Sequence, residues 1–149
     1  MIHPTAILGV DAFMYPRSKD GKRPRSGYQN HGYEVSPESD IWAHVIVVGG
    51  IQRPTEIRAG ARLAHRAHIG HDCIIGENSI VGVGAILCGF VTVGARCTIG
   101  VGALVMPELI IASDCFVGAG VIVTDNLPAN TKITVNGRRQ NWEHLPWSG

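Results

Sequence analysis

The chain has 149 residues, and its 13 Lys and Arg against 12 Asp and Glu give a formal net charge of +1. This balance excludes the strong basic field that marks many nucleic-acid binders, and no apolar run is long enough to span a bilayer. The 19 glycines, with an excess of Ile and Val over Leu, favour strands and turns over helices. We therefore expect one soluble, β-rich domain.

The N-terminal residues fit two six-residue units, 2–7 and 8–13, so a repeat begins almost at the first residue. We expect no separate domain before it. The opening residues lack the charged and apolar regions of a signal peptide, and the four cysteines fit free thiols, which together predict a cytoplasmic protein. Cys97 and Cys115, 18 residues apart, are expected to be small core residues on neighbouring coils, with no disulfide.

Residues 14–34 break the repeat and are expected to form an extruded loop. The loop carries five basic residues around the turn signal Asp20-Gly21: Arg17, Lys19, Lys22, Arg23 and Arg25. One interpretation is a solvated charged loop. The other is a phosphate contact, because Arg and Lys are the usual partners of phosphoanions, and Arg23 and Arg25 are then the predicted substrate-binding residues.

The repeat returns after this loop, passes through one irregular coil at 49–56, and then runs without interruption. Every sixth residue is Ile, Leu or Val over twelve units: Ile57, Leu63, Ile69, Ile75, Val81, Leu87, Val93, Ile99, Val105, Ile111, Val117 and Val123. This period predicts a β-helix with these side chains buried inside. Segments 81–87, 99–105 and 117–123 also repeat at 18 residues, so each coil is predicted to be a triangle of three units.

The predicted organisation is a β-helix over 1–126, with the loop at 14–34, followed by a C-terminal tail over 127–149. The tail contains Trp142, Leu145 and Trp147. Because an open coil end is an unpaired sheet edge, we expect this tail to cover that end or to pack on a neighbouring subunit.

The hexapeptides resemble those of the hexapeptide-repeat acyltransferases. His68-Ile-Gly-His71-Asp72-Cys73 is similar to the active-site segment of the family's lipid A pathway members, and the chain from Phe13 to the irregular coil resembles its UDP-acylglucosamine N-acyltransferases. Residues 123–139 instead resemble small sugar O- and N-acetyltransferases that use acetyl-CoA. Unlike larger members, the sequence shows no N-terminal nucleotide-sugar domain, so loops are expected to recognise the acceptor.

The resemblance implies an all-β, left-handed parallel β-helix that assembles as a homotrimer. It also implies acyl transfer from acetyl-CoA to a sugar or nucleotide sugar, with no tightly bound cofactor and no nucleic-acid partner. The residues leave open whether the acceptor is an amine or a hydroxyl, and whether the acyl group is acetyl, formyl or longer.

Acyl transfer needs a base for the acceptor's proton and a donor for the developing oxyanion. The resemblance makes His71 the base and Gly89, 18 residues later, the backbone N–H donor. Asp72 either orients the imidazole, binds the acceptor or is a solvated turn residue. His68 matches a position that contacts the acceptor, and His65 has no assigned role.

The resemblance also predicts where acetyl-CoA binds. A column of glycines would receive its pantetheine arm, and two cations would lie near its nucleotide end: Gly82, Gly84, Gly100, Gly102, Gly118 and Gly120, with Arg138 and Arg139. Alternatively, the glycines serve only to form turns, and the two arginines are solvated charges.

Two other functions remain as alternatives, a zinc enzyme of the trimeric β-helix carbonic anhydrase type and a non-catalytic scaffold. Imidazole is a common zinc ligand, and His65, His68 and His71 lie close in sequence. However, that family has a further histidine where this chain has Gly76. His65 and His71 also occupy the same unit position on adjacent faces, so no metal site is predicted.

Overall fold

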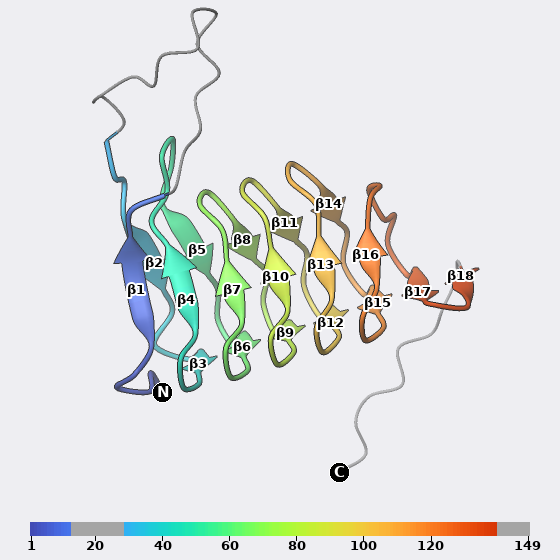
Figure 1. The fold of residues 1–149 in the computed structure, drawn as a ribbon, viewed down its shortest axis with the longest axis horizontal. Coiled ribbons are helices and arrows are strands. Elements are labelled where there is room, and N and C mark those ends of the chain that lie inside the picture. The colour runs from blue at the N-terminus through green and yellow to red at the C-terminus, as the bar shows by residue number, and fades with distance from the viewer. Residues whose placement is uncertain (13–28, 140–149) are drawn as a thin grey trace, which may run out of the picture.

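The computed structural model describes residues 1–12 and 29–139, which form a left-handed parallel β-helix (Figure 1). Its eighteen strands lie in three sheets, and these described residues contain no helix. From β1 to β16, successive strands enter sheets 1, 2 and 3 in turn, which makes each coil triangular as predicted. The predicted fold class is therefore confirmed.

Sheet 1 holds six parallel strands, which are β1 (Ile7–Val10), β4 (Ile46–Val48), β7 (His68–Ile69), β10 (Ile86–Leu87), β13 (Leu104–Val105) and β16 (Ile122–Val123). Sheet 2 holds five, which are β2 (Tyr33–Val35), β5 (Thr55–Ile57), β8 (Ile74–Ile75), β11 (Thr92–Val93) and β14 (Ile110–Ile111).

Sheet 3 contains the remaining strands, and its last strand is antiparallel. They are β3 (Asp40–Ile41), β6 (Arg62–Leu63), β9 (Ile80–Val81), β12 (Thr98–Ile99), β15 (Phe116–Val117), β17 (Lys132–Thr134) and β18 (Gly137–Arg139).

The pairing register between strands places equivalent positions of the six-residue repeat next to each other in neighbouring coils. Ile86 of β10 pairs with His68 of β7 on one side and with Leu104 of β13 on the other, so paired residues are 18 positions apart. The twelve predicted core residues are all at most 2% exposed. Alternation along each short strand therefore sends one side chain into the core and the next outward.

Two-residue turns form the corners of the prism, and from the turn at 43–44 to the turn at 119–120 the second residue has a left-handed backbone. At the corner between sheets 1 and 2 this residue is Asp72, Phe90 or Glu108, with φ of 59°, 62° and 64°. Non-glycine residues rarely adopt this conformation. The three residues at this corner therefore adopt a backbone conformation that glycine would adopt with less strain.

Residues beyond 126 continue the β-helix. Leu127 is 2% exposed within the core, and β17 pairs in parallel with β15 before β18 folds back on it. The expected boundary after residue 126 thus falls within a continuous core. Likewise, β2 already begins at Tyr33, inside the range expected for the loop.

The predicted phosphate contacts Arg23 and Arg25 lie outside the described residues, as do Trp142, Leu145 and Trp147. Within 1–12 and 29–139, no helix is long and apolar enough to cross a membrane. The four cysteines are free, and Cys97 and Cys115 are buried in the core.

Candidate active site

The corner between sheets 1 and 2 collects the irregular parts of the chain. The turns at 71–72, 89–90 and 107–108 stack along this edge, next to the segment 49–54 (Figure 1). Strand β1 ends and strand β2 begins near the same edge. The predicted base therefore lies beside the irregular segment 49–54.

His71 and Asp72 form a hydrogen-bonded pair at this corner. Nδ1 of His71 lies 2.9 Å from Oδ2 of Asp72, and the side chains are 20% and 0% exposed. An ionised carboxylate can only accept, so Nδ1 carries the proton and Nε2 keeps a free lone pair. The pair thus presents Nε2 as a base.

The irregular coil encloses the Asp72 carboxylate. The backbone N–H of Ile51 donates to Oδ2 at 2.9 Å, and those of Gln52 and Arg53 donate to Oδ1 at 2.8 and 2.9 Å. Burial acts to raise the pKa of Asp72, but these three bonds and the bond from His71 outweigh it and lower the pKa. The carboxylate therefore stays ionised and fixed.

The backbone of Asp72 is held as well. Nε and Nη2 of Arg53 donate to the Asp72 carbonyl at 3.3 and 3.0 Å, and the Asp72 N–H donates to Oγ1 of buried Thr55 at 2.9 Å. The Asp72 side chain is therefore buried and not a solvated turn residue, and its carboxylate is hydrogen-bonded to three backbone N–H groups and to His71.

The imidazole of His71 lies over Gly89 of the next coil. A Cβ built on Gly89 would be 2.4 Å from Nε2, although the φ of Gly89 is not left-handed. Glycine is needed here for space beside the imidazole. The Gly89 N–H bonds to no described residue, an arrangement common to the first residue of these corners. What distinguishes Gly89 is its position under Nε2.

Phe90 also belongs to this group, although the sequence analysis did not predict it as a site residue. Its ring meets the His71 ring edge to face, with centroids 5.0 Å apart, and its N–H donates to the His71 carbonyl at 2.9 Å. Its φ of 62° is shared with the second residues of other corner turns, so the ring contact and not the backbone distinguishes Phe90. The sequence signal was an aromatic residue at a turn position.

The other histidines lie away from Nε2. His68 is half-buried on the outer face of β7, and burial lowers its pKa, which favours the neutral imidazole. His65 lies at the corner between sheets 3 and 1, with its ring 5.3 Å from that of Trp42. In the part of the chain that the structure describes, no three His, Cys, Asp or Glu side chains are grouped to hold a metal.

The predicted glycine column divides into two sets. Gly82, Gly100 and Gly118 face the next coil, where a Cβ on Gly82 would be 2.8 Å from backbone atoms. The other set, Gly84, Gly102 and Gly120, forms left-handed turns with open space outside the corner between sheets 3 and 1. Sheet 1 separates this corner from His71, so a single chain does not bring them together.

The predicted nucleotide-binding arginines lie in β18. Arg138 is exposed and lines a cavity of about 330 Å³ together with Lys132, Thr134, Asn136 and Gly137. Arg139 pairs with Lys132 in the backbone register. This cavity is at the C-terminal end of sheet 3, apart from the His71 corner.

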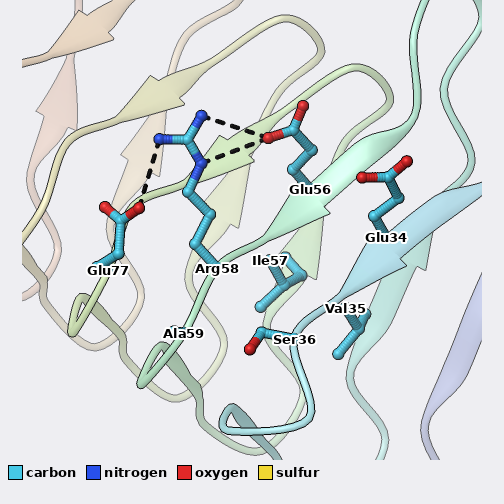
Figure 2. Close-up of a pocket in the computed structure, with 8 residues that line it drawn as sticks. All are labelled: Glu34, Val35, Ser36, Glu56, Ile57, Arg58, Ala59 and Glu77. Atoms are coloured by element: carbon cyan, nitrogen blue, oxygen red, sulfur yellow. Dashed lines mark hydrogen bonds and ion pairs between the residues drawn. The ribbon is translucent and has the colours of Figure 1, made fainter.

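Two grooves border sheet 2. One, of about 480 Å³, adjoins the His71 corner and is lined by Gln52, Arg53, Phe90, Thr92, Glu108 and Ile110. The other, of about 370 Å³, lies at the opposite edge of the sheet (Figure 2). There Arg58 contacts Glu56 at 3.3 Å and Glu77 at 3.7 Å, and none of the predicted site residues is present.

Comparison with known families supports this assignment of the repeat. The model of the bacterial transferase hexapeptide (six repeats) matches residues 54–89, which include His71, Asp72 and Gly89. No curated protein matches the whole sequence significantly.

Solved structures share the architecture. A histidine-to-alanine mutant of GDP-perosamine N-acetyl transferase from Caulobacter crescentus, in complex with CoA and GDP-perosamine, is 26% identical, with a TM-score of 0.65 over 93% of this chain and 54% of that one. The acetyltransferase domain of PglB from Neisseria gonorrhoeae, in complex with acetyl coenzyme A, is 24% identical. Its TM-score is 0.61, over 72% of this chain and 54% of that one. LpxA from Acinetobacter baumannii is 20% identical, with a TM-score of 0.79 over 92% of this chain and 51% of that one.

The chain spans about half the length of these three proteins. Likeness at 20% and 24% identity shows a common fold, and the matched repeats carry the same six-residue pattern that builds it here. Together, the six-residue pattern, the model matched over residues 54–89 and the shared architecture show that this chain carries bacterial-transferase hexapeptide repeats folded as the left-handed β-helix of these solved structures.

Proposed function

We propose that the protein transfers an acyl group, most simply acetyl from acetyl-CoA, to an amine or hydroxyl of a sugar, with His71 as general base. The observation that carries the proposal is the Asp72–His71 pair, which holds Nε2 free above Gly89. The complex of the 26% identical N-acetyl transferase with CoA and GDP-perosamine supports both ligand classes.

The proposed reaction follows from this geometry. Nε2 of His71 accepts a proton from the acceptor N–H or O–H as that atom attacks the thioester carbonyl. The Gly89 N–H stabilises the resulting oxyanion. When the carbon–sulfur bond breaks, His71 returns the proton to the leaving thiolate, which gives the acylated sugar and free CoA. Asp72 stabilises the imidazolium in between and keeps its charge.

The donor would lie along the corner between sheets 3 and 1. The open turns at Gly84, Gly102 and Gly120 follow one another there and lead toward the cavity of Lys132 and Arg138. Coils about 4.8 Å apart place that cavity roughly 15–20 Å along the axis from the His71 coil. An extended pantetheine arm can bridge this span, and the two cations suit the anionic nucleotide end.

The two halves of this site meet only if copies of the chain assemble. The outward residues of sheet 1 form an apolar column broken by one histidine: Ile7, Ile46, His68, Ile86, Leu104 and Ile122. The matching columns of sheets 2 and 3 begin instead with paired charged residues, Glu34 with Glu56 and Asp40 with Arg62. We infer a homotrimer that buries sheet 1 and joins the His71 corner of one copy to the glycine corner of the next.

Release of free CoA thiol in the presence of amino and hydroxy sugars tests the activity. His71→Ala should lower the turnover rate about 10²- to 10⁴-fold while the strand-rich circular dichroism spectrum is kept, as expected for a lost general base. His65→Ala, which removes a histidine with no proposed role in proton transfer, is the matched control and should lower the rate much less. Retained activity in His71→Ala, or an equal loss in both variants, would contradict the assignment.

The finer proposal is that the acceptor is a nucleotide sugar whose diphosphate binds the basic residues Arg23 and Arg25. Replacing both with Gln should raise the KM for the acceptor and leave the KM for acetyl-CoA nearly unchanged, because lost ground-state binding appears in KM. A change in the acetyl-CoA KM alone would assign these residues to the donor, and no change in either would remove support for the nucleotide.

The alternatives make different predictions. A zinc enzyme of the carbonic anhydrase type would retain stoichiometric metal after purification and hydrate carbon dioxide. A non-catalytic scaffold would release no CoA thiol with any acceptor.

A further inference from the structure

The groove beside the His71 corner has oppositely charged walls. Arg53 and Gln52 come from the irregular coil after β4, and Glu108 comes from the turn after β13, three coils further along. Phe90 belongs to the lining and also contacts the His71 ring, so the groove opens next to the proposed base. At about 480 Å³ it lies within the range of small-molecule sites.

Arg53 presents a fixed cation to this groove. Its Nε and Nη2 donate to the Asp72 carbonyl at 3.3 and 3.0 Å, which fixes the plane of the guanidinium. No carboxylate among residues 1–12 and 29–139 forms an ion pair with it. A guanidinium has five N–H donors, so its Nη1 edge remains available for an anionic ligand.

Glu108 presents an anion across the same groove. Its N–H donates to the Gly89 carbonyl at 3.0 Å, and its left-handed φ of 64° sets the direction of the side chain. Its carboxylate forms no ion pair with any cation that the structure describes. A carboxylate in this position can accept hydrogen bonds from hydroxyl or amino groups.

The second groove of sheet 2 provides the contrast. Figure 2 shows Arg58 lying between Glu56 and Glu77, so that its charge is satisfied within the protein. In the groove beside His71, Arg53 and Glu108 form no ion pair with each other, and the ring of Phe90, on the coil before Glu108, and the side chain of Ile110 also line the groove. That surface suits the C–H face of a sugar ring.

We propose that this groove is the acceptor subsite, and that it takes a sugar with an anionic substituent, a phosphate or a carboxylate, bound by Arg53. Glu108 accepts hydrogen bonds from the sugar's hydroxyl or amino groups, and Phe90 packs on its ring. The proposal rests on the acyl transfer proposed above and specifies its acceptor. The acceptor then reaches His71 from the side of sheet 2, while the donor approaches from the side of sheet 1.

The test compares three acceptors at saturating acetyl-CoA: glucosamine, its 6-phosphate and its 6-carboxylate, glucosaminuronic acid. CoA thiol release gives kcat/KM for each. The wild-type protein should favour at least one anionic sugar over glucosamine by roughly ten- to a hundredfold, the effect of one charge-assisted hydrogen bond. Which of the two is favoured identifies the anion as phosphate or carboxylate.

Arg53→Gln should reduce this preference to near parity through the KM of the anionic sugar. Because Arg53 also holds the Asp72 carbonyl, kcat should fall by the same factor for all three sugars, and the ratio of their KM values is the readout. Glu108→Gln should raise the KM of all three sugars and keep their ratio. Arg58→Gln and Glu77→Gln, in the other groove, are matched controls that should keep wild-type values. Equal wild-type kcat/KM for the three sugars, or a preference that survives Arg53→Gln, overturns the proposal.

A binding measurement separates this proposal from the proposed activity. Inorganic phosphate and acetate are titrated into ¹⁵N-labelled protein without acetyl-CoA. One of them should shift the amide signals of Gln52, Phe90 and Glu108 in the wild-type protein and in Arg58→Gln, and not in Arg53→Gln. Absence of these shifts overturns the subsite whether or not the protein turns over acetyl-CoA. If the shifts are present but the protein does not turn over acetyl-CoA, the anion site is supported and the proposed acyl transfer is contradicted.

Discussion

The imidazole of His71 is bound on one side and free on the other. Asp72 holds Nδ1 at 2.9 Å, Phe90 packs against the ring, and Gly89 provides the space under Nε2. Each neighbour restricts a different motion, so the ring is positioned before any ligand binds. Such preorganisation lowers the reorganisation needed when charge develops.

Gly89→Ala should abolish most activity and leave the fold intact. The new Cβ would lie 2.4 Å from Nε2 and displace the ring, whereas the φ of Gly89 suits an alanine. In a His71→Ala background the same substitution meets no imidazole and should cost little more. A double-mutant cycle on turnover therefore should show strong non-additivity. Additive losses would mean that Gly89 acts without the imidazole.

At the scale of elements, the irregular coil provides what a regular hexapeptide lacks. A regular corner has two turn residues, whereas the segment between β4 and β5 brings three successive N–H groups to one carboxylate. Its departure from the six-residue period is therefore the feature that allows Asp72 to be buried as an ion. The interruption in the pattern marks the site as clearly as the motif does.

This enclosure predicts how stability depends on pH. Because the pKa of Asp72 is lowered on folding, the folded state binds its proton less readily than the unfolded state does. The stabilisation from Asp72 should be fully present above the ordinary Asp pKa of about 3.9 and lost as the pH falls through the lower folded value. Urea unfolding of the wild-type protein and Asp72→Asn should show a difference at pH 7 that shrinks below about pH 4. A difference that does not depend on pH would contradict this account.

The same elements show what could be predicted from the sequence. The buried column from Ile57 to Val123 and the placement of Gly89 beside His71 depend only on periods of six and 18, so both were predictable. The enclosure of Asp72 and the contact with Phe90 depend on how an irregular segment folds between coils, which a periodic pattern does not encode. The glycines fit the period, but the pattern does not show which corner faces a ligand.

At the scale of the whole molecule, one face differs from the other two. Sheet 1 exposes Ile7, Ile86 and Ile122 at 50%, 44% and 60% in one register column, and exposed Trp42, Val83 and Val101 border it at the next corner. An apolar patch of this kind is typical of a subunit interface. The separation of the two proposed half-sites by this sheet is a second reason to expect assembly.

Ile122→Lys should weaken the trimer, because it buries an unpaired charge in the proposed interface. Light scattering should give a mass of about three times 15.9 kDa for the wild-type protein and a lower mass for the variant at micromolar concentration. Ile110→Lys, at a position of similar exposure on sheet 2, is the control and should keep the trimer. A wild-type monomer that transfers acyl groups would refute the shared site.

The 18-residue register also has a consequence at the level of the gene. Since Ile86, Leu104 and Ile122 occupy equivalent places, an in-frame duplication or deletion of 18 codons, 54 nucleotides, between the turns at 95–96 and 113–114 leaves every side chain on its own face. Loss of an odd number of codons turns the core column outward, because the buried positions of each unit are separated by even numbers of residues. Unequal recombination can therefore change the distance from His71 to Arg138 in steps of one coil. The spacing between the two proposed parts of the site can vary in this way while the core residues stay the same.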